Sequence, residues 1–154
     1  MTKKLKFKAK IGQVDFTNIR WAPVINCVLK FKNKYLVIQR SADMNFYPSY
    51  WNGVSGFLDD NRSLEQKVFD ELGEELGIKK EQVNRIKLAE IFDQDEPKYN
   101  KTWIVHPVLV EVNTDKITLD WEGRDFRWLT MDEIMKLDLL PGFDKVLEKI
   151  KMLE

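Results

Sequence analysis

Four carboxylate side chains fall within six consecutive residues of this chain, in the run from Asp70 to Glu75. The flanking residues predict that this run is helical. Ser63 and Gln66 have the spacing of a capping box, in which each side chain accepts a hydrogen bond from the other residue's backbone N–H at the start of a helix. Gly77 has the position of a glycine that ends a helix. We therefore predict a helix over residues 64–76, whose core-facing stripe consists of Leu64, Val68, Leu72 and Leu76.

This acidic helix carries several energetic penalties. Glu71 and Glu75 are four residues apart, and like charges at that spacing cost about 0.2–0.5 kcal/mol per pair. Gly73 inside the helix costs about 1 kcal/mol relative to alanine. A bound divalent cation would offset these costs, and Mg²⁺ suits the run because it takes one or two carboxylates together with substrate phosphate oxygens. A solvated acidic helix face is the alternative, and the spacing alone does not separate the two interpretations.

The segment from Gly56 to Ile78 resembles the Nudix box, G-x5-E-x7-R-E-U-x-E-E-x-G-U, where U is an aliphatic residue. Gly56 matches the first glycine. The six defined positions among the last eight of the box are matched, at the same spacing, by Glu71, Leu72, Glu74, Glu75, Gly77 and Ile78. Two positions differ, because Arg62 stands where the family has glutamate and Asp70 stands where it has arginine.

These two differences reverse the charge at both positions. We therefore predict that Arg62 and Asp70 still form an ion pair, with reversed polarity, that holds the loop before the helix against the helix. The alternative is that Asp70 only adds another acid to the run and that catalysis is weak or absent.

The residues before the box also resemble the family. Arg40, Tyr47, Pro48 and Trp51 match a pattern in which an arginine after a strand and a tyrosine-proline-x-x-tryptophan run lead to a glycine pair. Here Ser55 and Gly56 stand in place of that pair, and the resemblance implies that the Ser55 carbonyl helps to bind metal. Aromatic rings can stack on nucleobases or cover the core. We expect Trp51 in the core and keep Phe46 and Tyr47, with Arg40, as candidate substrate-binding residues.

A looser resemblance lies near the C-terminus. Glu122 and Gly123, followed by Trp128 at the last strand, fit a pattern in which the glutamate reaches the metal site or acts as a base. Three other acids could take this place, namely Asp125, Glu96 and Asp95.

Together these matches span residues 24–150 and imply an α/β/α sandwich with a mixed, curved sheet. The implied activity is hydrolysis of a nucleoside diphosphate linked to another moiety, a class that includes nucleoside triphosphates and nucleotide sugars. Glu71, Glu74 and Glu75 would bind Mg²⁺, with Mn²⁺ as an alternative. Glu71, Glu74 and Glu122 are the candidate catalytic residues, and Arg40 would bind phosphate.

Two other functions share this scaffold. A Nudix-fold nucleotide-binding or regulatory module with little or no activity would bind ligand without turnover. An isomerase of isoprenoid diphosphates would need a catalytic cysteine and histidine ligands. The chain has one cysteine and one histidine, Cys27 and His106, both in apparent strands, which disfavours the isomerase.

Composition limits the remaining classes. A chain of 154 residues is expected to form a single domain over residues 1–154. Its 25 basic and 25 acidic side chains balance, which argues against general binding to nucleic acid or to a membrane surface. Cys27 lies in an apolar run and is expected to be buried. No signal peptide or membrane span is indicated, so we expect a cytoplasmic protein with a small-molecule substrate.

The hydrophobic pattern predicts alternating strands and helices. We expect strands over residues 5–14, 21–31, 35–39, 86–92, 102–112 and 126–129, a short helix from 131 to 137 and a terminal helix over 143–153. Residues 93–100 are expected to form a polar loop. Pro107 should mark an edge, a bulge or a strand end. The opening strand could serve a homodimer.

Overall fold

The computed structural model describes residues 8–154, and its centre is a mixed β-sheet. Strand β1 (Trp21–Phe31) is paired with β2 (Lys34–Arg40) and β4 (Val54–Phe57) in antiparallel fashion, and with β7 (Lys101–Val112) in parallel fashion. Strand β2 also pairs with the short β3 (Trp51–Asn52) and with β8 (Gly123–Leu129). The far side of β7 carries β5 (Val83–Leu88) and β6 (Phe92–Glu96).

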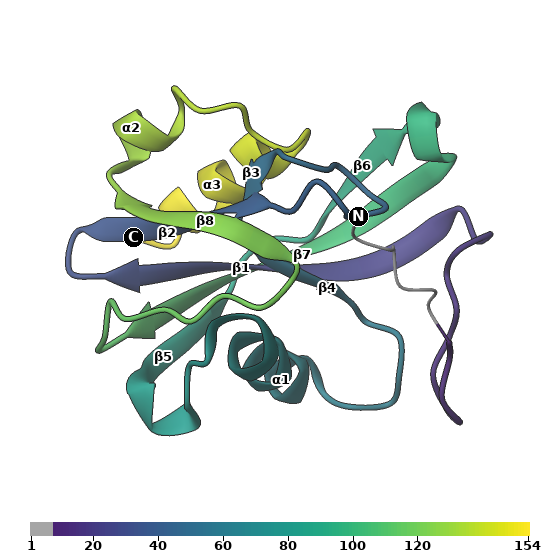
Figure 1. Cartoon of the computed structure of the whole chain (residues 1–154), viewed down its shortest axis with the longest axis horizontal. Coiled ribbons are helices and arrows are strands. Elements are labelled where there is room, and N and C mark those ends of the chain that lie inside the picture. Colours follow the sequence, from purple (N-terminus) through teal and green to yellow (C-terminus); the bar gives the residue numbers. More distant parts are fainter. Residues whose placement is uncertain (1–7) are drawn as a thin grey trace.

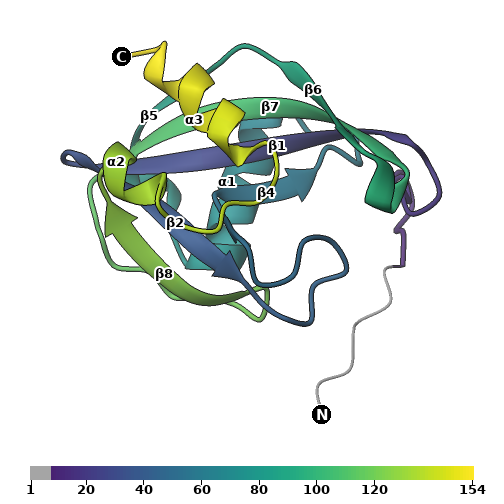
Figure 2. The same ribbon diagram turned by 90° about the horizontal axis from the view of Figure 1, so that it is seen from above.

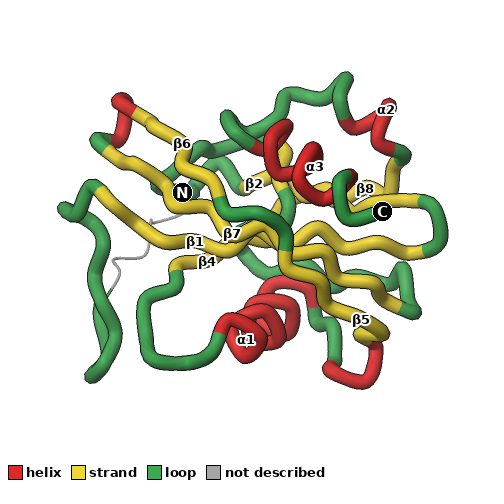
Figure 3. Tube along the Cα trace, turned by 180° about the vertical axis from the view of Figure 1, so that it is seen from behind, coloured by secondary structure: helices red, strands yellow, loops and turns green. Residues whose placement is uncertain are grey.

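Helices cover both faces of this sheet. Figure 1 shows α1 (Leu64–Leu76) on one side, with α2 (Met131–Ile134) and α3 (Phe143–Lys151) on the other, and Figure 3 shows the same separation from behind. Seen from above in Figure 2, α3 lies across β1 and β7. Each face has its own buried apolar cluster, one under α1 and one under α3. The α/β sandwich with a mixed sheet that the sequence predicts is therefore confirmed.

Helix α1 begins and ends as predicted. The Ser63 side chain accepts a hydrogen bond from the Gln66 backbone N–H, and the Gln66 side chain accepts one from Ser63. Gly77 adopts a left-handed conformation with φ of 67°, and its N–H donates to the carbonyls of Gly73 and Leu72. Val68, Leu72 and Leu76 are buried in the core, whereas Leu64 is only partly buried against it. The apolar period therefore fixes the face that α1 turns toward the sheet.

Pro107 lies inside β7 rather than at its edge or end. It is paired with Asn26 of β1, and its carbonyl accepts a hydrogen bond from the Ala89 N–H on the opposite side. On that side the partner of β7 changes, because β5 pairs as far as Leu88 and β6 begins at Phe92. The backbone nitrogen and carbonyl of one strand residue face the same neighbouring strand. The N–H that Pro107 lacks would therefore point to the gap between β5 and β6, where no strand needs it.

Two predicted elements are wrong. Residues 5–7 of the predicted opening strand lie outside the described residues, and residues 8–14 form a turn instead of a strand. In that turn Gly12 has φ of 82° and the Gln13 N–H donates to the Lys10 carbonyl. Residues 93–100 are not a loop, since they contain most of β6 and the 3-10 helix η2 (Pro97–Tyr99). The acids of β6 fit an edge strand because Asp93 and Asp95 both point to solvent.

The other predicted elements are found within a few residues of their expected bounds, whereas the short strands β3 and β4 were not predicted. A second 3-10 helix, η1 (Lys80–Gln82), precedes β5, which starts and ends earlier than expected. Thr130 and Glu133 form the capping box of α2. Helix α3 buries Phe143, Val146, Leu147 and Ile150. Within residues 8–154, none of the helices has the length and apolar character that crossing a membrane requires.

Candidate active site

The first glycine of the predicted box makes room for the first glutamate of the acidic run. A Cβ atom on Gly56 would lie 2.6 Å from Glu71 Oε1, so a side chain at this position would displace the Glu71 carboxylate. Strand β4 therefore carries glycine where α1 presses Glu71 against it. Burial is the main cause that raises the pKa of Glu71, and the nearby Glu74 charge acts in the same direction.

Three carboxylates meet at the end of α1, and we call them the acidic cluster: Glu75, Asp120 and Glu122. One oxygen atom from each lies within 4.8 Å of the others. The Asp120 N–H donates to the Glu75 carbonyl at 3.1 Å, and the Glu122 N–H donates to Asp120 Oδ1 at 3.0 Å. These bonds hold the turn before β8 against the last turn of α1.

The acidic cluster is only partly compensated, because the charge of Arg40 opposes the rise in the pKa of Glu122 but does not cancel it. Glu75 Oε2 is buried and has no hydrogen-bond partner among residues 8–154. Burial, followed by the charge of Glu122, raises the pKa of Glu75 well above its usual value. Burial and then Asp120 raise the pKa of Glu122 to about 7. An oxygen-only donor set with an unpaired buried oxygen fits a hard divalent cation such as Mg²⁺.

Without a divalent cation, the protein is expected to lose stability as the pH rises from about 4.5 to about 7. Over this range the folded protein keeps a proton on Glu122 that the unfolded chain has released, so folding becomes less favourable with rising pH. Saturating Mg²⁺ should abolish the fall because it binds the ionised carboxylates. Thermal melting with EDTA and with Mg²⁺ measures both curves. The Glu122→Gln variant is expected to show a smaller fall, and a flat EDTA curve in the unmodified protein would contradict the prediction.

Arg40 lies between the acidic cluster and the loop of residues 41–50. Its Nε and Nη2 donate to the Phe46 carbonyl at 3.1 and 2.9 Å, and Nη1 is 3.5 Å from Ser55 Oγ. Burial lowers the pKa of Arg40, and the charges of Glu122 and Glu75 oppose that shift. The predicted phosphate-binding arginine is thus already engaged with the loop, and it turns positive charge toward the acidic cluster.

The two aromatic candidates occupy different environments. Phe46 packs edge-on against Tyr99 and Trp103, with ring centroids 5.1 and 5.2 Å apart. Tyr47 is only 5% exposed, and its hydroxyl accepts a hydrogen bond from Trp103 Nε1 at 2.8 Å. Trp51 is buried, so its expected place in the core is confirmed.

A single cavity of about 700 Å³ brings most of the predicted residues together. Its lining includes Arg40, Phe46, Tyr47, Ser55, Glu71, Glu74 and Glu122. Glu75 is absent from the lining and lies in the acidic cluster next to it. The three alternatives to Glu122 are absent from the lining as well. Asp125 is 3.8 Å from Arg127, Asp95 accepts a hydrogen bond from Thr102, and Glu96 ends β6.

Sequence reasoning missed Asp120 and the buried Lys67. Asp120 stands two residues before Glu122, and that spacing was the only local signal that both acids could reach Glu75. Lys67 had no such signal, because a lysine in a helix is usually solvated. It is 4% exposed, and its Nζ lies 3.0 Å from Asp59 Oδ1 and 3.6 Å from Asp60 Oδ2.

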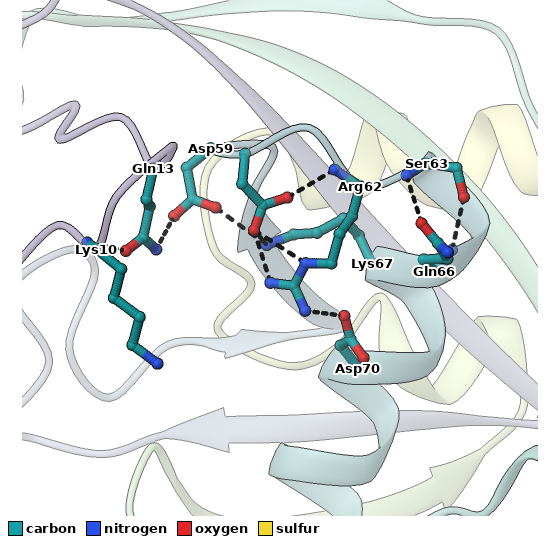
Figure 4. Close-up of polar contacts among 9 residues, drawn as sticks. Lys10, Gln13, Asp59, Arg62, Ser63, Gln66, Lys67 and Asp70 are labelled. Carbon is teal, nitrogen blue, oxygen red and sulfur yellow. Dashed lines mark hydrogen bonds and ion pairs between the residues drawn. The ribbon is translucent and has the colours of Figure 1, made fainter.

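The predicted ion pair between Arg62 and Asp70 is present (Figure 4). Arg62 also donates to Asp60 through Nε and Nη2 at 2.9 and 2.7 Å. Asp60 Oδ2 lies 2.7 Å from Arg62 Nη2 and 3.6 Å from Lys67 Nζ, so it is shared between the two cations. Figure 4 shows these two cations side by side. The loop before α1 is thus tied to the helix at two of its turns.

Exchanging the charges of Arg62 and Asp70 tests whether this pair acts as a unit. Arg62→Glu alone should lower stability and turnover, because it places a carboxylate beside Asp60 and Asp70. Adding Asp70→Arg should restore part of the loss, with a coupling of about 0.2–1 kcal/mol because both side chains are partly exposed. Chemical denaturation and kinetics of the four proteins give this coupling. A double variant no better than either single variant would show that the pair contributes nothing.

Cys27 and His106 provide no catalytic pair. Cys27 is buried as expected, and burial raises the pKa of its thiol well above the usual value. His106 Nδ1 contacts the carbonyl oxygens of Val24 and Ile104, both at 3.1 Å. A buried neutral thiol and a histidine bound to backbone carbonyls do not favour the isomerase.

Comparison with known families agrees with this geometry. The family model of the NUDIX domain matches residues 20–150. The chain belongs to the NUDIX family. The match includes the segment from Gly56 to Ile78 that resembles the box. Comparison with curated proteins gave no match.

Solved NUDIX structures share the fold at low sequence identity. The NUDIX domain of Shewanella oneidensis NrtR, complexed with ADP ribose, is 17% identical with a TM-score of 0.71, and the match covers 85% of this chain and 86% of that one. The MutT protein from Methanosarcina mazei Go1 is 16% identical with a TM-score of 0.72, covering 89% and 98%. A C. elegans Ap4A hydrolase in a binary complex is 20% identical with a TM-score of 0.68, covering 86% and 96%.

Proposed function

We propose that this protein is a Mg²⁺-dependent NUDIX hydrolase that cleaves the pyrophosphate bond of a nucleoside diphosphate linked to another moiety. The observation that carries this proposal is the meeting of the box glutamates with Glu122 at one cavity, beside the unpaired Glu75 Oε2. The reversed pair of Arg62 and Asp70 supports activity, because the loop is still tied to α1. The protein would act in the cytoplasm on a small-molecule substrate.

Each group has a separate task in this proposal. Glu71, Glu74 and Glu75 would hold the ion together with Asp120 and the Ser55 carbonyl. Mg²⁺, or Mn²⁺ in its place, neutralises diphosphate oxygens and lowers the pKa of a bound water when it is present. Glu122 would accept the proton of the attacking water, and a pKa of about 7 suits a base that works near neutral pH.

The substrate would be held by the other side of the cavity. Arg40 would contact phosphate with its guanidinium group, while the hydrogen bonds from Nε and Nη2 to the Phe46 carbonyl keep the loop in place. Phe46 and Tyr47 would contact the nucleoside, together with the apolar lining of the cavity. The solved relatives named for ADP ribose and Ap4A support a nucleotide substrate class.

A substrate panel with and without Mg²⁺ tests the proposal. Nucleoside triphosphates, dinucleoside polyphosphates, ADP-ribose and nucleotide sugars are incubated with the protein and the products are separated by chromatography. We expect Mg²⁺-dependent release of two phosphorylated fragments, or of a monophosphate and pyrophosphate from a triphosphate. The Glu74→Gln variant should abolish this release. Equal product formation by the variant would overturn the assignment of the box glutamates.

The second candidate is a nucleotide-binding or regulatory module. The observation in its favour is that Arg62 and Asp70 depart from the family's box. It predicts that members of the same panel bind to the protein, as measured by calorimetry, and are recovered intact. Turnover of any nucleotide at a rate that depends on Mg²⁺ and Glu74 would exclude it.

A further inference from the structure

Asn26 is a buried polar residue at the wall of the cavity, and the proposed hydrolysis gives it no task. It lies in β1, is 5% exposed and belongs to the lining of the cavity. Its Nδ2 donates to Asn52 Oδ1 at 2.9 Å. Among residues 8–154, its Oδ1 has no hydrogen-bond partner.

An unpaired buried acceptor lowers stability, because the oxygen has lost water without gaining a donor. An aliphatic side chain would avoid this cost, and the neighbours of Asn26 on the same face of β1, Val24 and Val28, are aliphatic. The amide therefore needs an explanation other than packing.

The surrounding backbone accommodates this amide closely. A Cβ atom on Gly53 would lie 2.4 Å from Asn26 Oδ1 and 3.3 Å from Phe143 Cε1. Glycine at position 53 thus leaves the space in which the amide sits beside the Phe143 ring. Phe143 also lines the cavity, so the amide and an aromatic ring stand together at its wall.

A chain of polar contacts joins Asn26 to the site of hydrolysis. Asn52 Nδ2 donates to Ser55 Oγ at 3.3 Å, and Arg40 Nη1 is 3.5 Å from the same oxygen. Arg40 and Glu122 both line the cavity, and the charge of Glu122 acts on Arg40. These contacts connect the Asn26 amide to the part of the cavity where the diphosphate would be cleaved.

We propose that Asn26 is a specificity-determining residue whose Oδ1 accepts a hydrogen bond from an N–H group of the substrate's nucleobase. The proposal rests on the proposed function, since it places the base in the same cavity. A cavity of about 700 Å³ has the size of a nucleotide site, and Trp103 and Phe143 give it apolar aromatic walls. A planar base that carries an amino group supplies the missing donor together with an aromatic face.

Asn26 Oδ1 is buried next to Gly53, so a ligand reaches it only when the amide turns toward the cavity. The last side-chain torsion of asparagine has a broad energy profile, so the amide can turn toward the cavity, and the hydrogen bond gained from the base then replaces the bond from Nδ2 to Asn52 Oδ1 that the turn breaks. A base that presents no N–H to Asn26 leaves Oδ1 unpaired and gains no affinity from this residue. Recognition at Asn26 therefore favours donors over acceptors.

Equilibrium binding to Asn26 variants tests this assignment. Calorimetry in Mg²⁺ measures the Kd of methylene-bridged analogues of ATP, GTP and CTP, and of inorganic tripolyphosphate, which has no base. For Asn26→Leu we expect the Kd of the tightest nucleotide analogue to rise by about ten-fold or more. The Kd of tripolyphosphate should not change, and the melting temperature should equal or exceed that of the unmodified protein.

Two further variants complete the test. Asn26→Ser is smaller and polar, and should give the same loss if the leucine variant folds poorly. Asn113→Leu is the matched control, because Asn113 is exposed and donates to the Glu81 carbonyl away from the cavity. The proposal is overturned if Asn26→Leu leaves nucleotide affinity unchanged, weakens tripolyphosphate equally, or if the unmodified protein gains no affinity from a base. Turnover is not needed, so a protein that binds these nucleotides without hydrolysis ends the proposed function and leaves the test of Asn26 intact.

Discussion

Lys67→Met is expected to be the most destabilising single change in the loop and helix that carry the NUDIX box. The side chains of Lys67 and Asp59 are only 5% and 7% exposed, and Lys67 also lies near Asp60. Removing the cation leaves a buried carboxylate without its partner, which typically costs about 3–5 kcal/mol. For a domain of this size the melting temperature should fall by roughly 6–20 °C.

The matched control for Lys67 is Arg62→Met. Arg62 is 43% exposed on its side chain, and an ion pair in that environment contributes about 0–1 kcal/mol. Adding Asp59→Asn to Lys67→Met should recover part of the loss, because an amide needs no counter-charge and can still bond to Gln13. Differential scanning calorimetry measures the melting temperatures of the unmodified protein, the two single variants and the double variant. A loss for Lys67→Met no larger than that for Arg62→Met would show that the buried contacts are not what holds the loop.

Glu75→Gln is expected to have the largest effect on function, with opposite effects on stability and on metal binding. In the metal-free protein the amide relieves the repulsion that Glu75 shares with Glu122 and Glu71, so the melting temperature should rise. Affinity for Mg²⁺ should fall by at least about ten-fold, and kcat by about 10²–10³-fold, because a ligand that stabilises developing charge is lost.

Glu65→Gln provides the comparison for Glu75. Glu65 lies in the first turn of the same helix and is exposed, so Glu65→Gln should change neither the melting temperature nor the affinity for Mg²⁺. Calorimetric titration with Mg²⁺ measures affinity independently of turnover. If Glu75→Gln and Glu65→Gln bind Mg²⁺ equally well, the acidic cluster is not the metal site.

The sequence predicted the features whose hydrogen bonds or ion pairs join residues close together in the chain. The ends of α1 follow from Ser63, Gln66 and Gly77, whose hydrogen bonds are made within a few residues. The ion pair of Arg62 and Asp70 could be predicted because the box fixes both positions on one loop and one helix turn. The resemblance then placed Glu122 at the cavity although it lies 47 residues after Glu75.

The features that were missed depend on segments that meet only in the folded chain. Lys67 is buried because the loop before α1 folds back and brings Asp59 over the helix. The hydrophobic periodicity of the sequence does not predict the path of this loop. Asp120 joins Glu75 through backbone contacts between a turn and a helix end. The polar residues and Pro97 predict a loop over residues 93–100, yet an edge strand accepts acids on its exposed face. The alternation of residues 5–14 gave the wrong result over 8–14, where a tight turn closes instead.

The parallel pairing of β1 with β7 has a consequence for how this protein is made. Trp21 of β1 is paired with Thr102 and Lys30 with Glu111, so partners in the central ladder are 81 residues apart in the sequence. Closing so large a loop costs entropy before any contact repays it. During synthesis β1 has no β7 beside it until residue 111 has left the ribosome, and until then the box helix has only part of a sheet on which to pack.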